Sequence, residues 1–196
     1  MQIAKQPEIM GPGRPRDPQV DRAVLAAALE LLAEEGYTRL TMEGVAARAG
    51  VGKTSLYRRW NTKDALIIDA LAKPAVQPAF APVGELREDM SAYLRALVGY
   101  RRMHSRAISA VSSEVVSNSA LGEAFRARVM TPILRDLRAL IQAAVDRGQL
   151  PVDTDVVLLA SLAPALLHEQ LLLTGVLPDE AFVDRVVGQF FSGGRQ

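Results

Sequence analysis

The chain has 196 residues, of which 49% are apolar and 23% are charged, and its net charge is +1. This length and apolar content predict a folded chain with one compact core or two small ones. There is no cysteine and there are only two histidines, His104 and His168, which excludes a disulfide framework and a cysteine- or histidine-rich metal site. We therefore expect neither a metal nor a cofactor.

The amino-terminal stretch MQIAKQPEIMGPGRPR has no apolar segment of the kind that a signal peptide needs. The most apolar run of the chain, from Val156 to Leu167, is shorter than the roughly 20 residues of a membrane-spanning helix. We therefore expect a cytoplasmic protein without a membrane span. Residues 1–16 are interpreted as a flexible basic arm, in which proline keeps Arg14 and Arg16 extended.

The first predicted helix covers residues 18–35. Asp17, followed by proline, is suited to cap its start, and apolar residues then recur three and four positions apart until Gly36. Thr41 can cap a short second helix, and Gly50 can adopt the left-handed backbone that ends one.

A third helix is predicted from Lys53 to about Trp60, with Leu56 and Trp60 four residues apart on its inner side. Two short helices joined by a tight glycine turn are typical of a helix-turn-helix, whose second helix can enter the major groove of DNA. From Arg48 to Lys63 there are five basic residues and no acidic one. Such a local basic surface suits a polyanion, although a solvated basic face without a partner is the alternative.

Gly52-Lys53-Thr54 also matches the end of the nucleotide-binding loop G-x-x-x-x-G-K-[ST]. That loop needs a glycine at position 47, where the chain has Ala47, and a buried β-strand before it, which residues 42–50 do not predict. A nucleotide-binding enzyme that uses Lys53 and Thr54 is therefore the disfavoured alternative.

Residues 17–66 resemble the DNA-binding domain of the TetR/AcrR family of bacterial transcriptional regulators. The motif residues that carry the resemblance are Gly36-Tyr37, Thr41, Val45-Ala46, Ala49-Gly50-Val51, Leu56-Tyr57, Trp60 and Lys63. The chain departs from the family at Gly52, where a serine usually caps the recognition helix. Glycine is a tolerable cap, so this departure costs a few tenths of a kcal/mol.

The resemblance implies that the phosphates to be bound are those of DNA. We expect Tyr57 and Lys63 to contact the backbone, and the start of the third helix to approach base edges. Arg58 is the best candidate for a guanine, because its guanidinium donates two parallel hydrogen bonds. The extended arm can reach a narrow minor groove, with a disordered tail as the alternative. The full predicted set for DNA is Arg14, Arg16, Thr41, Lys53, Thr54, Ser55, Tyr57, Arg58, Arg59 and Lys63.

Further helices are predicted near residues 63–73, 85–102, 106–116, 121–147 with a kink at Pro132, 155–174 and 179–191. The chain is thus expected to be all-α, with about nine helices. An arm (1–16) and a three-helix DNA-binding domain (17–63) are followed by a ligand-binding and dimerisation domain (64–196).

A helical bundle can enclose an apolar cavity for a small molecule. The residues that we expect to line it are Tyr93, Tyr100, Met103, His104, Phe125, Met130 and His168. Ordinary core or surface packing is the alternative for each, and His168 also fits a subunit interface.

The last two helices are more apolar than one chain needs, and they predict a four-helix dimer interface, which the resemblance also implies. Its expected residues are Leu159, Leu166, Phe182, Val186 and Phe190. Core packing within one subunit is the alternative.

The resemblance, together with the predicted apolar interface, implies a homodimeric repressor that binds a palindromic operator and that a small molecule releases. An activator, or a regulator without a ligand, fits the same DNA-binding half. An enzyme is not expected, because the acidic and histidine residues form no catalytic signature.

Overall fold

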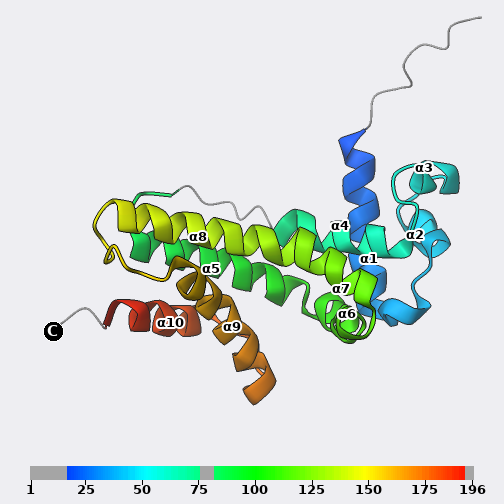
Figure 1. The fold of residues 1–196 in the computed structure, drawn as a ribbon. Coiled ribbons are helices and arrows are strands. Elements are labelled where there is room, and N and C mark those ends of the chain that lie inside the picture. The colour runs from blue at the N-terminus through cyan, green and yellow to red at the C-terminus, as the bar shows by residue number, and fades with distance from the viewer. Residues whose placement is uncertain (1–16, 76–81, 193–196) are drawn as a thin grey trace, which may run out of the picture.

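The computed structural model describes residues 17–75 and 82–192, and all regular structure in these residues is helical. Arg14 and Arg16 of the predicted arm lie outside the described residues. If α7, η1 and α8 are taken as one continuous helix, the described chain forms nine helices. The all-α prediction is confirmed, and the helices follow one another in the predicted order (Figure 1).

Helix α1 (Pro18–Arg39) begins where the sequence predicts. The carboxylate of Asp17 accepts a hydrogen bond from the backbone N–H of Gln19 at 2.9 Å, which satisfies one free donor at the helix start. Gly36 has φ +80°, so the regular helical backbone ends there and a short turn completes the element.

Three shorter helices follow: α2 (Met42–Arg48), α3 (Lys53–Tyr57) and α4 (Lys63–Ala75). Gly50, with φ +66°, makes the tight turn between α2 and α3. Val45, Leu56 and Trp60 are buried in the core against α1 and α4. They fix the position of α3, as the sequence predicts.

The long helical hairpin consists of α5 (Leu86–Met103), followed by α6 (Ser105–Ser117), and of α7 (Ser119–Phe125), η1 (Arg126–Met130) and α8 (Thr131–Asp146). The segment η1 is a π-helical turn directly before Pro132. Proline lacks the N–H that an α-helix needs and its ring crowds the preceding turn, so the helix widens there. In place of the kink predicted at Pro132, the structure has a π-helical turn, Arg126–Met130, just before it.

Helices α9 (Val156–Thr174) and α10 (Glu180–Ser192) end the described chain. Gly175, with φ +68°, ends α9. The apolar run continues beyond Leu167 to the end of this helix. By length and composition α9 could therefore cross a bilayer, contrary to the expectation that its apolar run is too short. One such helix is weak evidence for a membrane span. Only 22% of its most apolar stretch is buried in the protein, so most of this stretch is exposed on the single chain.

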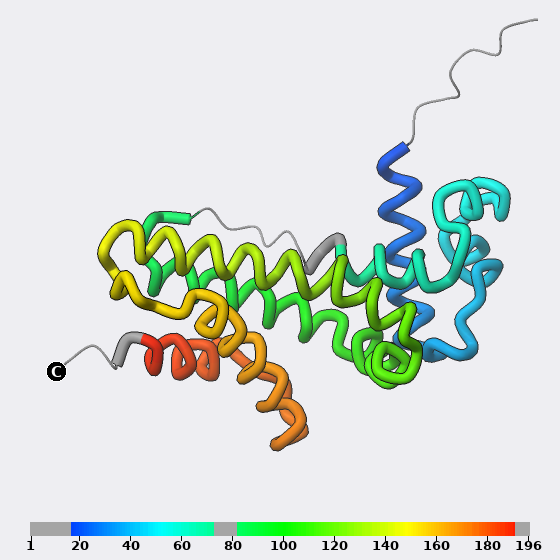
Figure 2. Tube along the Cα trace, viewed as in Figure 1, coloured from blue at the N-terminus to red at the C-terminus, as the bar shows by residue number. Residues whose placement is uncertain are grey.

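The helices pack in two directions. Helices α5 and α8 run side by side, and α1 crosses the end of this pair, where it packs against α4 and α6. Figure 2 shows that α2 and α3 lie at the α1 end of the molecule, whereas α10 lies at the other. The predicted DNA-binding helices thus occupy one end, and the most exposed apolar helix lies away from them.

Candidate DNA-binding surface

The starts of α2 and α3 are built differently. The hydroxyl of Thr41 accepts a hydrogen bond from the N–H of Gly44 at 3.1 Å and thereby caps α2. The cap position of α3 is Gly52, which provides no side-chain hydrogen bond. The first N–H groups of α3 are therefore open to an oxygen atom outside the protein, whereas Thr41 already satisfies a donor of α2.

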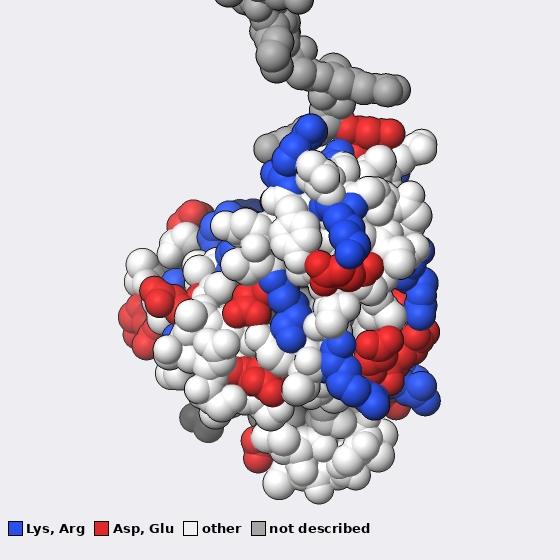
Figure 3. Space-filling view, turned by 90° about the vertical axis from the view of Figure 1, so that its right-hand side faces the viewer, with Lys and Arg blue, Asp and Glu red and all other residues white. Residues whose placement is uncertain are grey.

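The outer side of α3 carries the groups that can reach DNA. Lys53, Thr54 and Arg58 are exposed, and Ser55 is half-buried. Neither Lys53 nor Arg58 forms an ion pair with any residue in the described part of the chain. These two cations therefore keep their charge available to a partner. Figure 3 shows this end of the molecule, where basic side chains lie among acidic ones.

Two arginines of the basic run are instead bound to α1. Arg48 pairs with Glu34 at 2.8 Å and with Glu30 at 3.3 Å, which ties α2 to α1. The Nε atom of Arg59 lies 2.6 Å from Oδ1 of Asp21, and its guanidinium also donates to the hydroxyl of Ser55. Arg59 therefore connects the end of α3 to α1, because the carboxylate of Asp21, in the first turn of α1, faces its guanidinium.

Lys63 is also held within the protein. Its ammonium donates to the backbone carbonyl of Tyr37 at 2.9 Å and lies 4.1 Å from the centre of the Tyr37 ring. The Tyr37 hydroxyl donates to Asp64 at 2.7 Å. Burial, followed by the hydrogen bond and the charge of Asp64, raises the pKa of Tyr37 to about 12. Lys63 therefore anchors the start of α4 to the end of α1, and a phosphate contact would come in addition to this role.

Tyr57 has an acidic partner that the sequence did not indicate. Its hydroxyl donates to the carboxylate of Glu43 on α2 at 3.0 Å. The backbone N–H of Glu43, the Tyr57 hydroxyl and the charge of Lys53 all lower the pKa of Glu43, so this carboxylate is ionised at neutral pH. A phosphate contact by Tyr57 requires its hydroxyl to exchange Glu43 for a DNA oxygen.

A second carboxylate joins the recognition region to the rest of the chain. The indole N–H of Trp60 donates to one oxygen of Asp69 on α4 at 2.8 Å. The other oxygen of Asp69 pairs with Arg128 on η1. Sequence reasoning missed this connection, because the three residues belong to three separate elements and no local pattern relates them.

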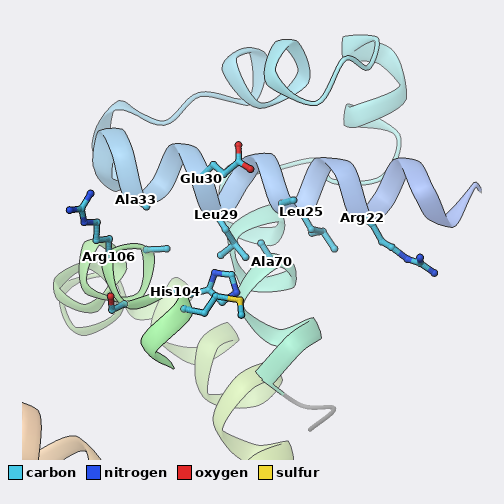
Figure 4. A pocket seen from close by; sticks show the side chains of 12 residues that line it. Arg22, Leu25, Leu29, Glu30, Ala33, Ala70, His104 and Arg106 are labelled. Carbon is cyan, nitrogen blue, oxygen red and sulfur yellow. The ribbon is translucent and has the colours of Figure 1, made fainter. Parts of the chain in front are cut away.

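Only some of the residues predicted to line an effector site lie near one another: Met103 and His104 are adjacent, and the ring of Tyr100 lies 4.7 Å from that of His104. Met103 and His104 line an open cavity of about 650 Å³ between α1 and the corner where α5 meets α6 (Figure 4). The hydroxyls of Tyr93 and Tyr100 donate to backbone carbonyls, of Ile133 at 3.4 Å and of Leu71 at 3.0 Å. The remaining candidates are outside this cavity: Phe125 and Met130 are half-buried, and His168 is exposed on α9.

The predicted interface residues differ in exposure. Leu166 on α9 is 43% exposed, and Leu159, Phe182 and Phe190 are half-buried. Val186 is 5% exposed and belongs to the core of the single chain, because α10 packs this side against α5. Further large apolar side chains of α9 are exposed: Val157, Leu158, Leu162, Leu172 and Leu173.

Comparisons with known proteins agree with this architecture. Residues 24–70 match the family described as bacterial regulatory proteins, tetR family, and residues 80–190 match the tetracyclin repressor-like C-terminal domain. The chain is 35% identical over 172 residues to the DNA-binding transcriptional repressor TetR of Mycobacteroides abscessus, which covers 84% of this chain and 88% of that protein. It is 28% identical over 185 residues to YdeS, an uncharacterised HTH-type transcriptional regulator of Bacillus subtilis, with 92% of each chain covered.

Solved structures give the same result. The TetR family transcription regulator SCO0332 superposes with a TM-score of 0.73 at 29% identity, over 91% of this chain and 100% of that one. FadR from Bacillus subtilis, solved in complex with stearoyl-CoA, has a TM-score of 0.71 at 18% identity, over 89% and 99% of the two chains. At that identity the second likeness shows a shared fold.

Proposed function

The chain belongs to the TetR family of bacterial transcriptional regulators, and on this basis we propose that it is a cytoplasmic repressor that binds a palindromic operator as a homodimer and leaves it when a small effector binds. Membership of the family makes the chain a sequence-specific DNA-binding regulator of transcription. Members of this family are not enzymes, so the nucleotide-hydrolase alternative for Lys53 and Thr54 is set aside.

The observation that carries the DNA-binding mode is that Lys53, at the start of α3, and Arg58, directly after its end, are exposed and form no ion pair with a residue that the structure describes. In our proposal α3 enters the major groove, Arg58 reads a guanine, and Lys53, Thr54 and Ser55 approach neighbouring bases or phosphates. Tyr57 and the N–H groups at the start of α3 contact the backbone. We take residues 17–63 as the DNA-binding part and residues 64–196 as the regulatory and dimerisation part.

A second copy of the chain is the proposed partner for the exposed face of α9. Leu158, Leu162 and Leu166 follow one another at four-residue steps along one side of this helix, and all three are exposed. Moving such a row of apolar side chains out of water and against a partner lowers the free energy of the system. Pairing α9 and the neighbouring α10 of two chains would form a four-helix interface. A two-fold dimer also suits a palindromic site, because the two recognition helices must enter grooves about 34–36 Å apart.

Selection of bound sequences from a library of randomised DNA tests this proposal. The expected result is a two-fold symmetric consensus, bound by a species that sediments as two chains or as a multiple of two. A non-symmetric consensus bound by a single chain would contradict the dimeric mode. A reporter gene behind the selected site then distinguishes repression from activation, because an activator raises transcription from it.

A further inference from the structure

The cavity between α1 and the α5–α6 corner joins the two functional halves of the chain. One wall is α1, which contributes Leu25, Ala26 and Leu29. The opposite wall is Met103 and His104, at the end of α5 and the junction with α6. In Figure 4 His104 lies across the cavity from Leu29. The volume of about 650 Å³ suits a small organic molecule.

The floor of this cavity is apolar. Leu25, Leu29 and Ala70 form it, and Met103, which is 79% exposed, lies at its edge. The imidazole of His104 lies 4.7 Å from the Tyr100 ring, and burial lowers its pKa, so at neutral pH it adds no charge to the wall. Leu25, Leu29 and Ala70 are only 6%, 7% and 2% exposed, so the apolar surface that a bound molecule would remove from water is mainly that of Met103.

Cations stand at both ends of the cavity. Arg22 and Arg106 lie at opposite ends in Figure 4, where their guanidinium groups extend away from the cavity, and both are exposed. Neither forms an ion pair with a residue in the described ranges. The one carboxylate among the lining residues is Glu30, and Arg48 already pairs with it at 3.3 Å. The ends of the cavity are therefore electropositive, and their long side chains can turn toward a bound anion.

We propose that this cavity binds an amphipathic carboxylate, with its apolar body on Leu25, Leu29 and Met103 and its carboxylate on Arg22 or Arg106, and that this binding weakens the complex with DNA. A guanidinium binds a carboxylate through two parallel hydrogen bonds, which selects this head group. The DNA response, but not the binding site itself, rests on the proposed function.

The position of the cavity explains how a ligand acts on DNA binding. Helix α1 is ion-paired to α2 through Glu34 and Arg48, and to the segment directly after α3 through Asp21 and Arg59. A molecule inserted between α1 and α6 changes the spacing of these two helices. Because α2 and α3 follow α1, the recognition helix moves with it, and the fit of a dimer to its operator changes.

The test uses decanoate as the probe and decanol as its uncharged counterpart, with binding to the full chain measured by calorimetry. The key variant is Arg22→Gln/Arg106→Gln, and its control, Arg102→Gln/Arg138→Gln, removes two exposed arginines that do not line the cavity. We expect decanoate to bind the control as it binds the unaltered chain, and to bind the key variant about tenfold more weakly, because charge-assisted hydrogen bonds are lost. Decanol should not distinguish the two variants.

A second variant, Ala26→Trp, fills the cavity from an exposed position of α1 and should abolish decanoate binding without unfolding the protein. Equal decanoate binding by the key variant and its control, or no binding to the unaltered chain, overturns the carboxylate site. Decanoate bound in the cavity with no change in DNA affinity overturns the response. An effector that still releases DNA from the Ala26→Trp variant acts elsewhere, which overturns this site and leaves the proposed function intact.

Discussion

Arg59 and Asp21 form an ion pair in which Nε lies 2.6 Å from Oδ1. This ion pair joins the segment directly after α3 to the first turn of α1. Both side chains are largely buried, at 14% and 22% exposure. Its neighbour Arg58 is exposed and forms no ion pair with the residues described, 17–75 and 82–192. Two adjacent arginines therefore differ in position: Arg59 is held in the fold, whereas Arg58 stays on the surface that we propose contacts DNA.

This difference predicts opposite results for two alanine variants. Arg59→Ala leaves Asp21 unpaired and should lower the free energy of unfolding by about 2 kcal/mol. Arg58→Ala should leave stability within about 0.5 kcal/mol but weaken operator binding by about 1–3 kcal/mol and relax one position in each half-site. Denaturant unfolding and binding to randomised sites measure these quantities. An unchanged consensus for Arg58→Ala would remove that residue from base recognition.

The pairing of Arg128 with Asp69 predicts an effect of a distant helix on DNA binding. Arg128→Gln frees one oxygen of Asp69, whose other oxygen holds the indole of Trp60, and the end of α3 should become less fixed. We expect weaker operator binding and a changed fluorescence of Trp60, which is the single tryptophan of the sequence.

The control for this variant is Arg135→Gln, since Arg135 pairs with its own neighbour Asp136 within α8. This change should affect neither fluorescence nor DNA binding. If both variants behave alike, Asp69 does not depend on Arg128 for its position.

The raised pKa of Tyr37 predicts a loss of stability in alkali. Its folded pKa of about 12 lies above the ordinary value of 10.0, so the folded state favours the neutral phenol. This contribution is complete below pH 10 and is lost as the pH rises through 12. Thermal unfolding at a series of pH values should show a smaller alkaline decline for Tyr37→Phe than for the unaltered chain. The same decline in both proteins would contradict the assignment.

The exposed face of α9 predicts that Leu166→Asp separates the proposed dimer into monomers. Leu166 is 43% exposed in the single chain, so a carboxylate there should not unfold it, but a dimer would have to bury the charge at a cost of several kcal/mol. Sedimentation should show a folded monomer with much weaker operator binding. Val152→Asp, at a 92% exposed position before α9, is the control and should remain dimeric. A dimeric Leu166→Asp protein would move the interface elsewhere.

Gly122 predicts a stability difference between two glycine positions. A Cβ atom at Gly122 would lie 2.4 Å from the backbone oxygen of Val115, so Gly122→Ala should destabilise the protein by about 1–3 kcal/mol. At Gly99, inside α5, no described atom beyond the adjoining residues and backbone of the helix lies within 4 Å of such a Cβ, and Gly99→Ala should stabilise the helix by about 0.5–1 kcal/mol. Chemical denaturation of both variants measures the difference. Equal effects would mean that α6 and α7 can separate at little cost.

The sequence by itself determined the helices and the family. The caps at Asp17 and Thr41, the turns at Gly36 and Gly50 and the irregularity before Pro132 all lie where local patterns place them. This is possible because caps, glycine dihedrals and the missing N–H of proline act within one helical turn. The motif residues of the helix-turn-helix also act locally, as core residues of a small unit.

Only the tertiary structure decided which basic side chains have partners within the protein and which remain available to bind DNA. In the sequence nothing distinguishes Arg58 from Arg59, or Lys53 from Lys63. In the structure Asp21 pairs with Arg59, and the carbonyl of Tyr37 accepts a hydrogen bond from Lys63. These partners lie 26 or more residues away along the chain, so no local periodicity reveals them. The sequence did not reveal that α1 forms the other wall of the cavity beside Met103. The reason is the same, because residues from distant parts of the chain come together only when the helices pack.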